Sequence, residues 1–440
     1  MLLRKAYRSL TVFAFFLAGT LLHAQDGEYS GFTPYSVYGV GQVLTPGTAY
    51  NKSMGGTGIA TRNIKYINYL NPAAVTARDT LSFMVDMSLS QNNSVFRQGD
   101  IKSANNLTNI NDLAISFPIY KSSAMMLGVA PYSATGYGFG SVYDDQALIG
   151  RSGSAGYTST GQGSLYQLFI GGGATFWKRI SIGAEWIHYF GTIAKNSKVV
   201  FGNSAYYGIS SGYGLMLRGD TGKFGLQYEQ SFAGGYKLTV GATYKLRTDL
   251  KGIVTDYSIS SGAAQSDTLR FRTDTLALSK NRPSFGSEMA VGISFGAANR
   301  WRAEVDYTRS NWSNSNFDVT PGLAVSGGST FSATCSESLR AGFEYIPNAN
   351  DIRYYMRKCT YRAGAYWDRS CFLLDGNNID AYGITLGITF PVFRYHNGVT
   401  LTADLGRRGS IADNMIRETF VNFTVGFNLF DYWFIKHQYE

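Results

Sequence analysis

The chain has 440 residues, enough for one large barrel or for two to three soluble domains. Charged residues make up only 16% of it, which argues against disorder, whereas aromatic residues make up 15% and glycine occurs 51 times. The formal net charge is +9, but no run of Lys and Arg exceeds two residues, so nucleic acid is not an expected partner.

The first residues have the pattern of a secretory signal peptide. Arg4, Lys5 and Arg8 precede the mostly apolar stretch Leu10–Leu22, which is too short to span a bilayer. We therefore predict a signal peptide over residues 1–24. Because this stretch is the only apolar run of helical length, any crossing of a membrane must be made by strands.

Residues 25–78 differ from everything that follows them. Glycines at 55, 56 and 58 and the tripeptide Asn71-Pro72-Ala73 interrupt regular structure there, yet apolar residues such as Ile59 require the segment to pack against something. One interpretation is an irregular N-terminal arm. The other is a plug, or hatch, folded into the lumen of a barrel made by residues 79–440.

Strand-like alternation begins after this segment. In Asp380–Phe390, Tyr382, Ile384 and Leu386 fall on one parity and small or polar residues on the other, as expected for a strand with one apolar face. About fourteen such strands are predicted, an even number as single-chain bacterial barrels require. They lie near Leu81–Leu89, Asp112–Ile119, Met125–Tyr132, Ser164–Phe176, Ile180–Phe190, Tyr213–Phe232, Tyr236–Arg247, Phe285–Phe295, Trp301–Arg309, Ser338–Tyr345, Tyr361–Arg369, Asp380–Phe390, Val399–Gly406 and Arg417–Leu429.

The connections favour a membrane barrel over a soluble β-sandwich, which would show the same alternation. Short turns such as Trp177–Arg179 and Ala233–Gly235 alternate with long loops such as Gln91–Asn111, Ser133–Gly163 and Thr248–Ser284. Short turns on one side and long loops on the other are typical of outer-membrane barrels. The predicted fold is therefore an all-β, transmembrane antiparallel barrel in the outer membrane. Its termini would face the periplasm and its apolar faces would contact lipid.

Two motifs resemble a known family. Met54-Gly-Gly-Thr-Gly58, followed by Asn71-Pro72-Ala73 just before the first strand, is similar to the hatch of the FadL-type transporters of long-chain fatty acids and toluene. The stretch Gly406–Ser410, with Arg417-Glu418 and Trp433-Phe434, looks like members of this family from Bacteroidetes-type bacteria.

The resemblance implies a fourteen-stranded barrel with an N-terminal hatch and no cofactor. Apolar ligands would be captured outside and released sideways into the membrane through a gap beside a kinked third strand. The third predicted strand carries Gly128 and Pro131, and proline cannot donate to a strand ladder. Pro131 marks either such a lateral gate or simply the end of a strand.

Two further sets of residues are candidates for ligand contact. Apolar residues in the outward loop Ser133–Gly163 predict either a capture groove or self-packing of the loop. Charged residues on the inward parity predict either ion pairs that hold the hatch or a polar permeation path. The loop residues are Tyr137, Phe139, Tyr143, Leu148 and Ile149, and the inward charges include Arg302, Glu304, Asp306, Arg340, Glu344, Arg362 and Asp404.

The three cysteines have no metal-ligand spacing. Cys335 and Cys371 should both lie at the outer rim, at the two upper ends of one hairpin, whereas Cys359 lies at the opposite end. We therefore predict a Cys335–Cys371 disulfide.

Catalysis has little support, because a nucleophile needs a base within reach in the lumen and the sequence predicts none there. The leading hypothesis is a channel for hydrophobic small molecules, such as fatty acids, working by passive, hatch-gated diffusion. The alternatives are an interaction protein that serves secretion or surface attachment, with a protein partner at the long loops, and a general porin. A plug of some fifty residues argues against an open porin.

Overall fold

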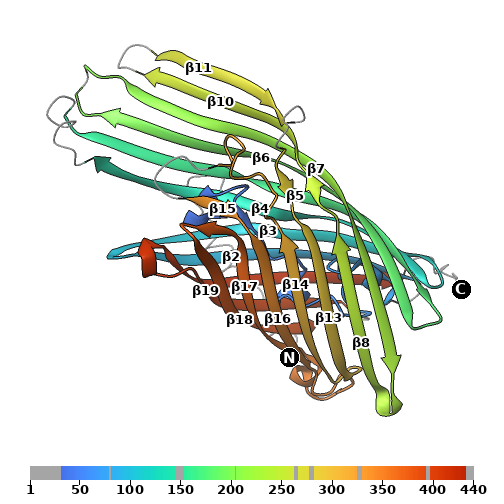
Figure 1. The fold of residues 1–440 in the computed structure, drawn as a ribbon. Coiled ribbons are helices and arrows are strands. Elements are labelled where there is room, and N and C mark those ends of the chain that lie inside the picture. Colours follow the sequence, from blue (N-terminus) through green and yellow to red (C-terminus); the bar gives the residue numbers. More distant parts are fainter. Residues whose placement is uncertain are drawn as a thin grey trace, which may run out of the picture.

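The computed structural model describes residues 31–78, 81–143, 153–203, 205–261, 266–276, 282–324, 330–392 and 397–432. Within them, fourteen strands pair in antiparallel fashion around a closed barrel (Figure 1). The last strand closes onto the first, from Ser82 opposite Tyr432 to Arg97 opposite Arg417. In order around the barrel they are β2 (Ser82–Gln98), β3 (Ile101–Tyr120), β4 (Ser123–Tyr143), β5 (Ala155–Phe176), β6 (Ile180–Phe201), β7 (Gly208–Ser231), β8 (Tyr236–Lys245), β13 (Ser287–Ala297), β14 (Trp301–Asn311), β16 (Cys335–Tyr345), β17 (Thr360–Leu374), β18 (Asn377–Pro391), β19 (Gly398–Arg408) and β20 (Arg417–Tyr432).

Each predicted strand is confirmed, but several are much longer than predicted. The predicted strand Met125–Tyr132 continues to Tyr143, and the predicted strand Asp112–Ile119 already begins at Ile101. Much of the predicted long loops is therefore paired strand. These extensions lack the apolar alternation because lipid contacts neither of their faces, so their pairing comes from neighbouring strands rather than from a sequence period.

A sheet projects beyond the barrel on one side (Figure 1). The hairpin β10 (Lys251–Ser261) and β11 (Ser266–Thr275) adds to the outer part of β7, from Gly208 opposite Ser261 to Arg218 opposite Lys251. The inner part of β7 pairs instead with β8. Two short strands, β9 (Thr248–Asp249) and β12 (Ser284–Phe285), pair where this insertion leaves and rejoins the wall.

Smaller elements complete the chain. β15 (Phe331–Ala333) pairs with β17, and single turns of 3-10 helix lie at η3 (Ala233–Gly235), η5 (Tyr355–Lys358) and η6 (Ala412–Asn414). No helix among the described residues is long and apolar enough to cross a membrane.

An apolar belt surrounds the inner part of the barrel. Outward-facing Tyr382, Ile384 and Leu386 on β18 are 51%, 54% and 52% exposed, as lipid-facing side chains would be without their lipid. Polar pairs end this belt on the side of the projecting sheet: His188 lies 2.8 Å from Asp220, and the Arg369 guanidinium lies 3.2 Å from the Asp380 carboxylate. Such a belt is what a barrel that crosses a membrane presents to lipid.

The N-terminal segment, residues 31–78, passes through the barrel interior. It has little regular structure: η1 (Pro34–Val37), β1 (Gln42–Val43), α2 (Ala49–Lys52) and η2 (Pro72–Thr76). Even so it is well buried, with Tyr50 and Met54 at 1% and 0% exposure. Its hydrogen bonds reach different parts of the wall, such as β7 and β18, so it crosses the lumen rather than lying along one side.

Candidate functional site

A track of inward-facing glycines receives the N-terminal segment. A Cβ added at any of these glycines would come closer than van der Waals contact to the segment, so a side chain there would displace it. The alternate strand positions with small or polar residues thus form the inner surface that contacts the segment. The track comprises Gly173, Gly183, Gly225, Gly241, Gly292, Gly342, Gly364, Gly387 and Gly426.

The tripeptide Asn71-Pro72-Ala73 lies on this track at the start of η2. The Asn71 side chain accepts a hydrogen bond from the Ala73 N–H at 3.0 Å, which caps η2, and donates to the Ile59 carbonyl at 2.7 Å. Its amide also lies 3.4 Å from the Leu226 carbonyl of β7. One side chain therefore joins two parts of the segment to the wall, which uses both halves of its amide.

Two lumen carboxylates hold the glycine-rich stretch. Asp306 of β14 accepts hydrogen bonds from the Gly58 and Ile59 N–H groups at 2.6 and 2.9 Å, and Glu304 accepts one from the Thr61 hydroxyl at 2.6 Å. The next turn is fixed from the other side of the lumen, where Gly55 donates to the Thr385 hydroxyl at 2.8 Å. Gly55 and Gly56 have φ values of 72° and 84°, which favour glycine.

Replacing Asp306 with Ala should loosen this stretch. The substitution leaves two buried N–H groups without an acceptor, and each such group lowers the free energy of unfolding by about 1–3 kcal/mol. We expect faster protease cleavage after Lys52 and Arg62 in detergent-solubilised protein. Asp306→Asn retains an acceptor oxygen and should be cleaved at close to the wild-type rate. Equal cleavage of the Ala and Asn variants would show that these hydrogen bonds do not hold the stretch.

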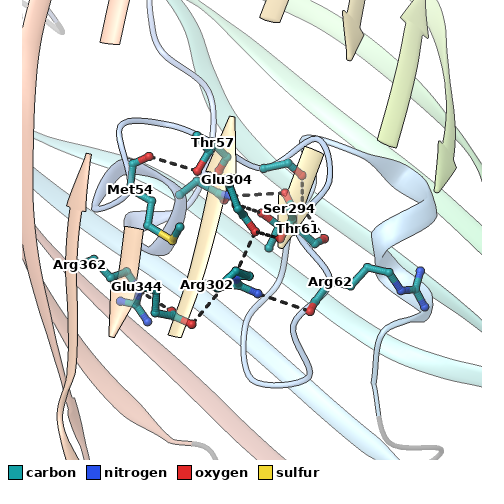
Figure 2. A network of polar contacts seen from close by, with 12 residues as sticks. Met54, Thr57, Thr61, Arg62, Ser294, Arg302, Glu304, Glu344 and Arg362 are labelled. Carbon is teal, nitrogen blue, oxygen red and sulfur yellow. Dashed lines mark hydrogen bonds and ion pairs between the residues drawn. The ribbon is translucent and has the colours of Figure 1, made fainter. Parts of the chain in front are cut away.

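A network of buried charges lies beside Thr61 (Figure 2). Arg302 contacts Glu304 at 3.1 Å and Glu344 at 3.2 Å, and Glu344 also binds Arg362 at 2.8 Å. The Arg362 guanidinium lies 4.5 Å from the Tyr50 ring centre and 5.0 Å from that of Tyr66, a second, cation–π attachment of the segment.

The other predicted lumen charges lie outside this network. Arg340 pairs with Asp368 at 2.7 Å and donates to the Gly55 carbonyl at 3.0 Å. Asp404 forms no ion pair within the described part of the chain and accepts instead from the Tyr366 hydroxyl at 2.9 Å. The structure therefore divides the seven predicted residues into one connected group of four, Arg340 with its own partner, and two carboxylates that accept hydrogen bonds.

Pairing between β3 and β4 stops part-way along both strands. It reaches only Leu113 opposite Val129, beyond which β3 continues with β2 alone. The register between β4 and β5 shifts between Pro131 and Ser133, so Tyr132 is bulged. The freed edge of β4 pairs with β1 of the N-terminal segment, and Leu44 donates to the Tyr132 carbonyl at 2.9 Å. The structure thus places Pro131 at a break in the barrel wall, and Gly128 just before it.

An aromatic cluster closes the lumen beyond β1. Tyr132, Tyr189 and Phe285 pack together with centroid distances of 4.6–5.0 Å, and Trp312 and Phe317 extend the cluster. The stretch after β14 folds back over the segment, since Gly39 donates to the Leu323 carbonyl at 3.2 Å. At the opposite edge, the Tyr35 hydroxyl donates to the Ile416 carbonyl at 2.5 Å. Burial raises the pKa of Tyr35 to about 12, so it stays a donor at neutral pH.

Two predictions need correction. Tyr137, Phe139 and Tyr143 are not in a loop but on the outer part of β4, where strand pairing separates them: Tyr137 is buried, whereas the other two are exposed. Leu148 and Ile149 lie outside the described residues.

The predicted Cys335–Cys371 disulfide is not formed, and both thiols are free. The register of β17 shifts between Arg369 and Leu373, and β15 takes the place opposite. Between these two pairs β17 has two more residues than β18, so the regular alternation of its side chains is interrupted there. Cys371 accordingly lies buried within the lumen, whereas Cys335 contacts Asn311 on the wall at 3.7 Å.

Several residues in the lumen were not predicted from the sequence. Tyr50, Tyr66 and Thr61 gave no signal, because the segment that carries them has no period. Gly225, Gly342 and Gly364 could have been found from the sequence, because each occupies one of the alternate strand positions that carry small or polar residues.

Comparisons with known proteins agree with this geometry. The toluene transporter TbuX from Ralstonia pickettii matches with a TM-score of 0.56 at 14% identity, over 88% of this chain and 98% of that chain. The toluene transporter TodX from Pseudomonas putida gives 0.56 at 15% identity, over 89% and 99%. A FadL homologue from Pseudomonas aeruginosa gives 0.53 at 11% identity, over 89% and 99%. These structures share the fold.

No curated protein sequence matches this chain. The family model described as BamG matches residues 6–440, nearly the whole length. The chain, an outer-membrane barrel with the FadL-type fold, therefore belongs to the BamG family.

Proposed function

We propose that this protein is a passive outer-membrane channel for hydrophobic small molecules, gated by the N-terminal segment acting as a hatch. The observation that carries the proposal is the break between β3 and β4, where the free edge of β4 is covered by β1 and, at Gly136, by Thr33 and Ser36 of that segment. Movement of β1 away from β4 would open a lateral path from the lumen to the lipid. The solved structures of similar fold include toluene transporters, which supports a hydrophobic ligand.

The lumen has space on the inner side of this break. A cavity of about 270 Å³ is lined in part by Val43 and Leu44 of the segment and by Pro131 and Tyr132 of β4. A ligand in this cavity would lie directly beside β1, whose displacement from β4 would lead it toward the bilayer. No chemistry is required of the protein, and a filled lumen argues against a general porin.

A crosslink between β1 and β4 tests the proposal. Gln42 and Ala134 are Cα partners, so Gln42→Cys with Ala134→Cys, in a background with the three native cysteines replaced by Ser, should bridge the two strands. We expect oxidation to abolish uptake of a fluorescent long-chain fatty acid into proteoliposomes, and reductant to restore it.

The matched control is Ser141→Cys with Tyr157→Cys. It joins β4 to β5 on the projecting sheet and should leave uptake unchanged. Unchanged uptake in fully oxidised Gln42→Cys/Ala134→Cys protein, with the bridge verified by mass, would rule out a lateral path past β1.

The projecting sheet favours a second function, an interaction with another protein. On this sheet, Phe271 of β11, Val200 of β6 and Ile209 of β7 are 70%, 48% and 42% exposed, which is unusual for side chains facing water. Removing β10 and β11 should abolish co-purification of such a partner without changing uptake. Unchanged co-purification would exclude this sheet as the docking surface.

Three further assignments belong to the proposal. The domain division would be a signal peptide over residues 1–24, a hatch over 25–78 and a barrel over 79–440. The chain ends and short turns would face the periplasm, which agrees with the sheet projecting on the other side of the belt. The stretch Gly406–Ser410, with Arg417-Glu418 and Trp433-Phe434, would mark a Bacteroidetes-type branch.

A further inference from the structure

One cavity in the lumen gathers buried polar atoms that lack a partner. Among the described residues, Glu185 Oε2, Asp306 Oδ1, Tyr189 Oη and Trp312 Nε1 have no hydrogen-bond partner, and all four residues line the same cavity of about 270 Å³. They are 4%, 3%, 1% and 4% exposed. Other buried side-chain polar atoms, such as Asp86 Oδ1 and Tyr50 Oη, also lack a partner, but these four are gathered around one space, where a bound polar group would satisfy them together.

Five cations and five carboxylates line the cavity, and most of them are already in ion pairs. Lys245 is paired with Glu288 at 3.0 Å, and Arg340 with Asp368 at 2.7 Å. Arg369 lies 3.9 Å from Glu337 and 3.2 Å from Asp380, and Arg408 lies 3.1 Å from Glu418. The charged lining residues without an ion pair in the described part of the chain are Lys223, Glu185 and Asp306.

Lys223 does not satisfy Glu185. Although the two residues are Cα partners on β6 and β7, the Lys223 ammonium donates to the Tyr69 carbonyl at 3.2 Å, and Glu185 Oε2 stays without a partner. Asp306 uses only its other oxygen, which holds the Gly58 and Ile59 N–H groups. A ligand here would meet two carboxylate oxygens that require donors and an indole N–H that requires an acceptor.

We infer that this cavity binds the polar head of an amphiphile, and that the head carries amine and hydroxyl groups rather than a carboxylate. An ammonium satisfies Glu185 and Asp306, whereas a hydroxyl oxygen accepts from Trp312. The apolar tail lies along Val43, Leu44 and Pro131, toward the break between β3 and β4. The inference rests on the proposed function and narrows its substrate class: a plain hydrocarbon would leave all four polar atoms unsatisfied.

Calorimetric titration of the protein in nanodiscs, with empty nanodiscs subtracted, tests this inference. The probes are N-octylglucamine, octanoate and octane, which share a tail length, and glucosamine, which has no tail. We expect N-octylglucamine to bind at least tenfold more tightly than octanoate or octane. Glu185→Gln should weaken N-octylglucamine binding about tenfold, the loss of one ion pair in a buried site.

Asp86→Asn is the matched control. Asp86 is likewise a buried lumen carboxylate with an unpartnered oxygen, but it does not line the cavity, so its variant should bind N-octylglucamine as the wild type does. Equal losses in the two variants would overturn the inference.

The probes separate failure of this inference from failure of the proposed function. If octane, octanoate and N-octylglucamine bind equally, the protein does not recognise the head group. That result contradicts the inference but agrees with a hydrophobic channel. If glucosamine binds as tightly as N-octylglucamine, the cavity is polar as inferred but the tail contributes nothing, and the hydrophobic channel falls. If no probe binds, both fall.

Discussion

Glu344→Gln should lower the free energy of unfolding of the barrel by about 3–5 kcal/mol, the range for breaking a buried ion pair by removing one partner. The Glu344 carboxylate neutralises both Arg302 and Arg362, and the Arg362 side chain has 0% exposure. Without the carboxylate, two guanidinium groups stay in the lumen beside the Tyr50 and Tyr66 rings with only Glu304 to balance them. Urea titration of the protein in detergent micelles, followed by tryptophan fluorescence, measures the change.

Glu337→Gln is the matched control on the same strand. Glu337 lies at the outer rim, where Arg309 and Arg369 are each 3.9 Å away and one-third to one-half exposed. Exposed pairs contribute about 0–1 kcal/mol, so this variant should unfold almost like the wild type. A double variant, Glu344→Met with Arg362→Met, should recover part of the loss, because removing both charges removes the unpaired cation. Equal destabilisation by Glu344→Gln and Glu337→Gln would mean that burial of the network does not matter.

Much of the barrel could be predicted because lipid imposes a period on the sequence. Outward positions such as Ile384 and Leu386 must be apolar, and positions between them face the lumen, so parity alone assigned Arg302, Glu304 and Glu344 inward. Strand residues that extend past the lipid are no longer required to be apolar at every second position. The outer part of β4, with Tyr137 and Phe139, therefore read as loop although it is strand.

The site could be predicted only in part, because its other half comes from the N-terminal segment. That segment is held by backbone groups of Gly55, Gly58 and Ile59, and a sequence does not show which side chains will bind a main-chain N–H. The sequence also does not reveal where the register between two strands shifts. One shift in β17 places the Cys371 side chain in the lumen, so an argument from hairpin ends paired it wrongly with Cys335.

Gly225→Val should open the lumen. A Cβ at Gly225 would overlap the Asn71 side chain and lie 2.8 Å from Pro72 Cδ, so the added side chain competes directly with η2 for its place on β7. Such overpacking costs about 1–3 kcal/mol, and the strand, held by two neighbours, is less able to move than the segment. We expect the segment to shift and single-channel conductance in planar bilayers to rise from near zero to discrete steps.

Gly222→Val separates this effect from loss of a glycine in a strand. Gly222 is on the same strand, but the nearest atom to its added Cβ is 3.6 Å away, an ordinary contact, so its variant should stay closed. If Gly225→Val lowers stability yet conducts no more than Gly222→Val, the segment is a fixed part of the barrel core and the hatch proposal fails. If Gly225→Val conducts, pairing of the segment with the wall is what keeps the lumen shut, and any ligand that releases Asn71 and Pro72 from β7 can act as the opener.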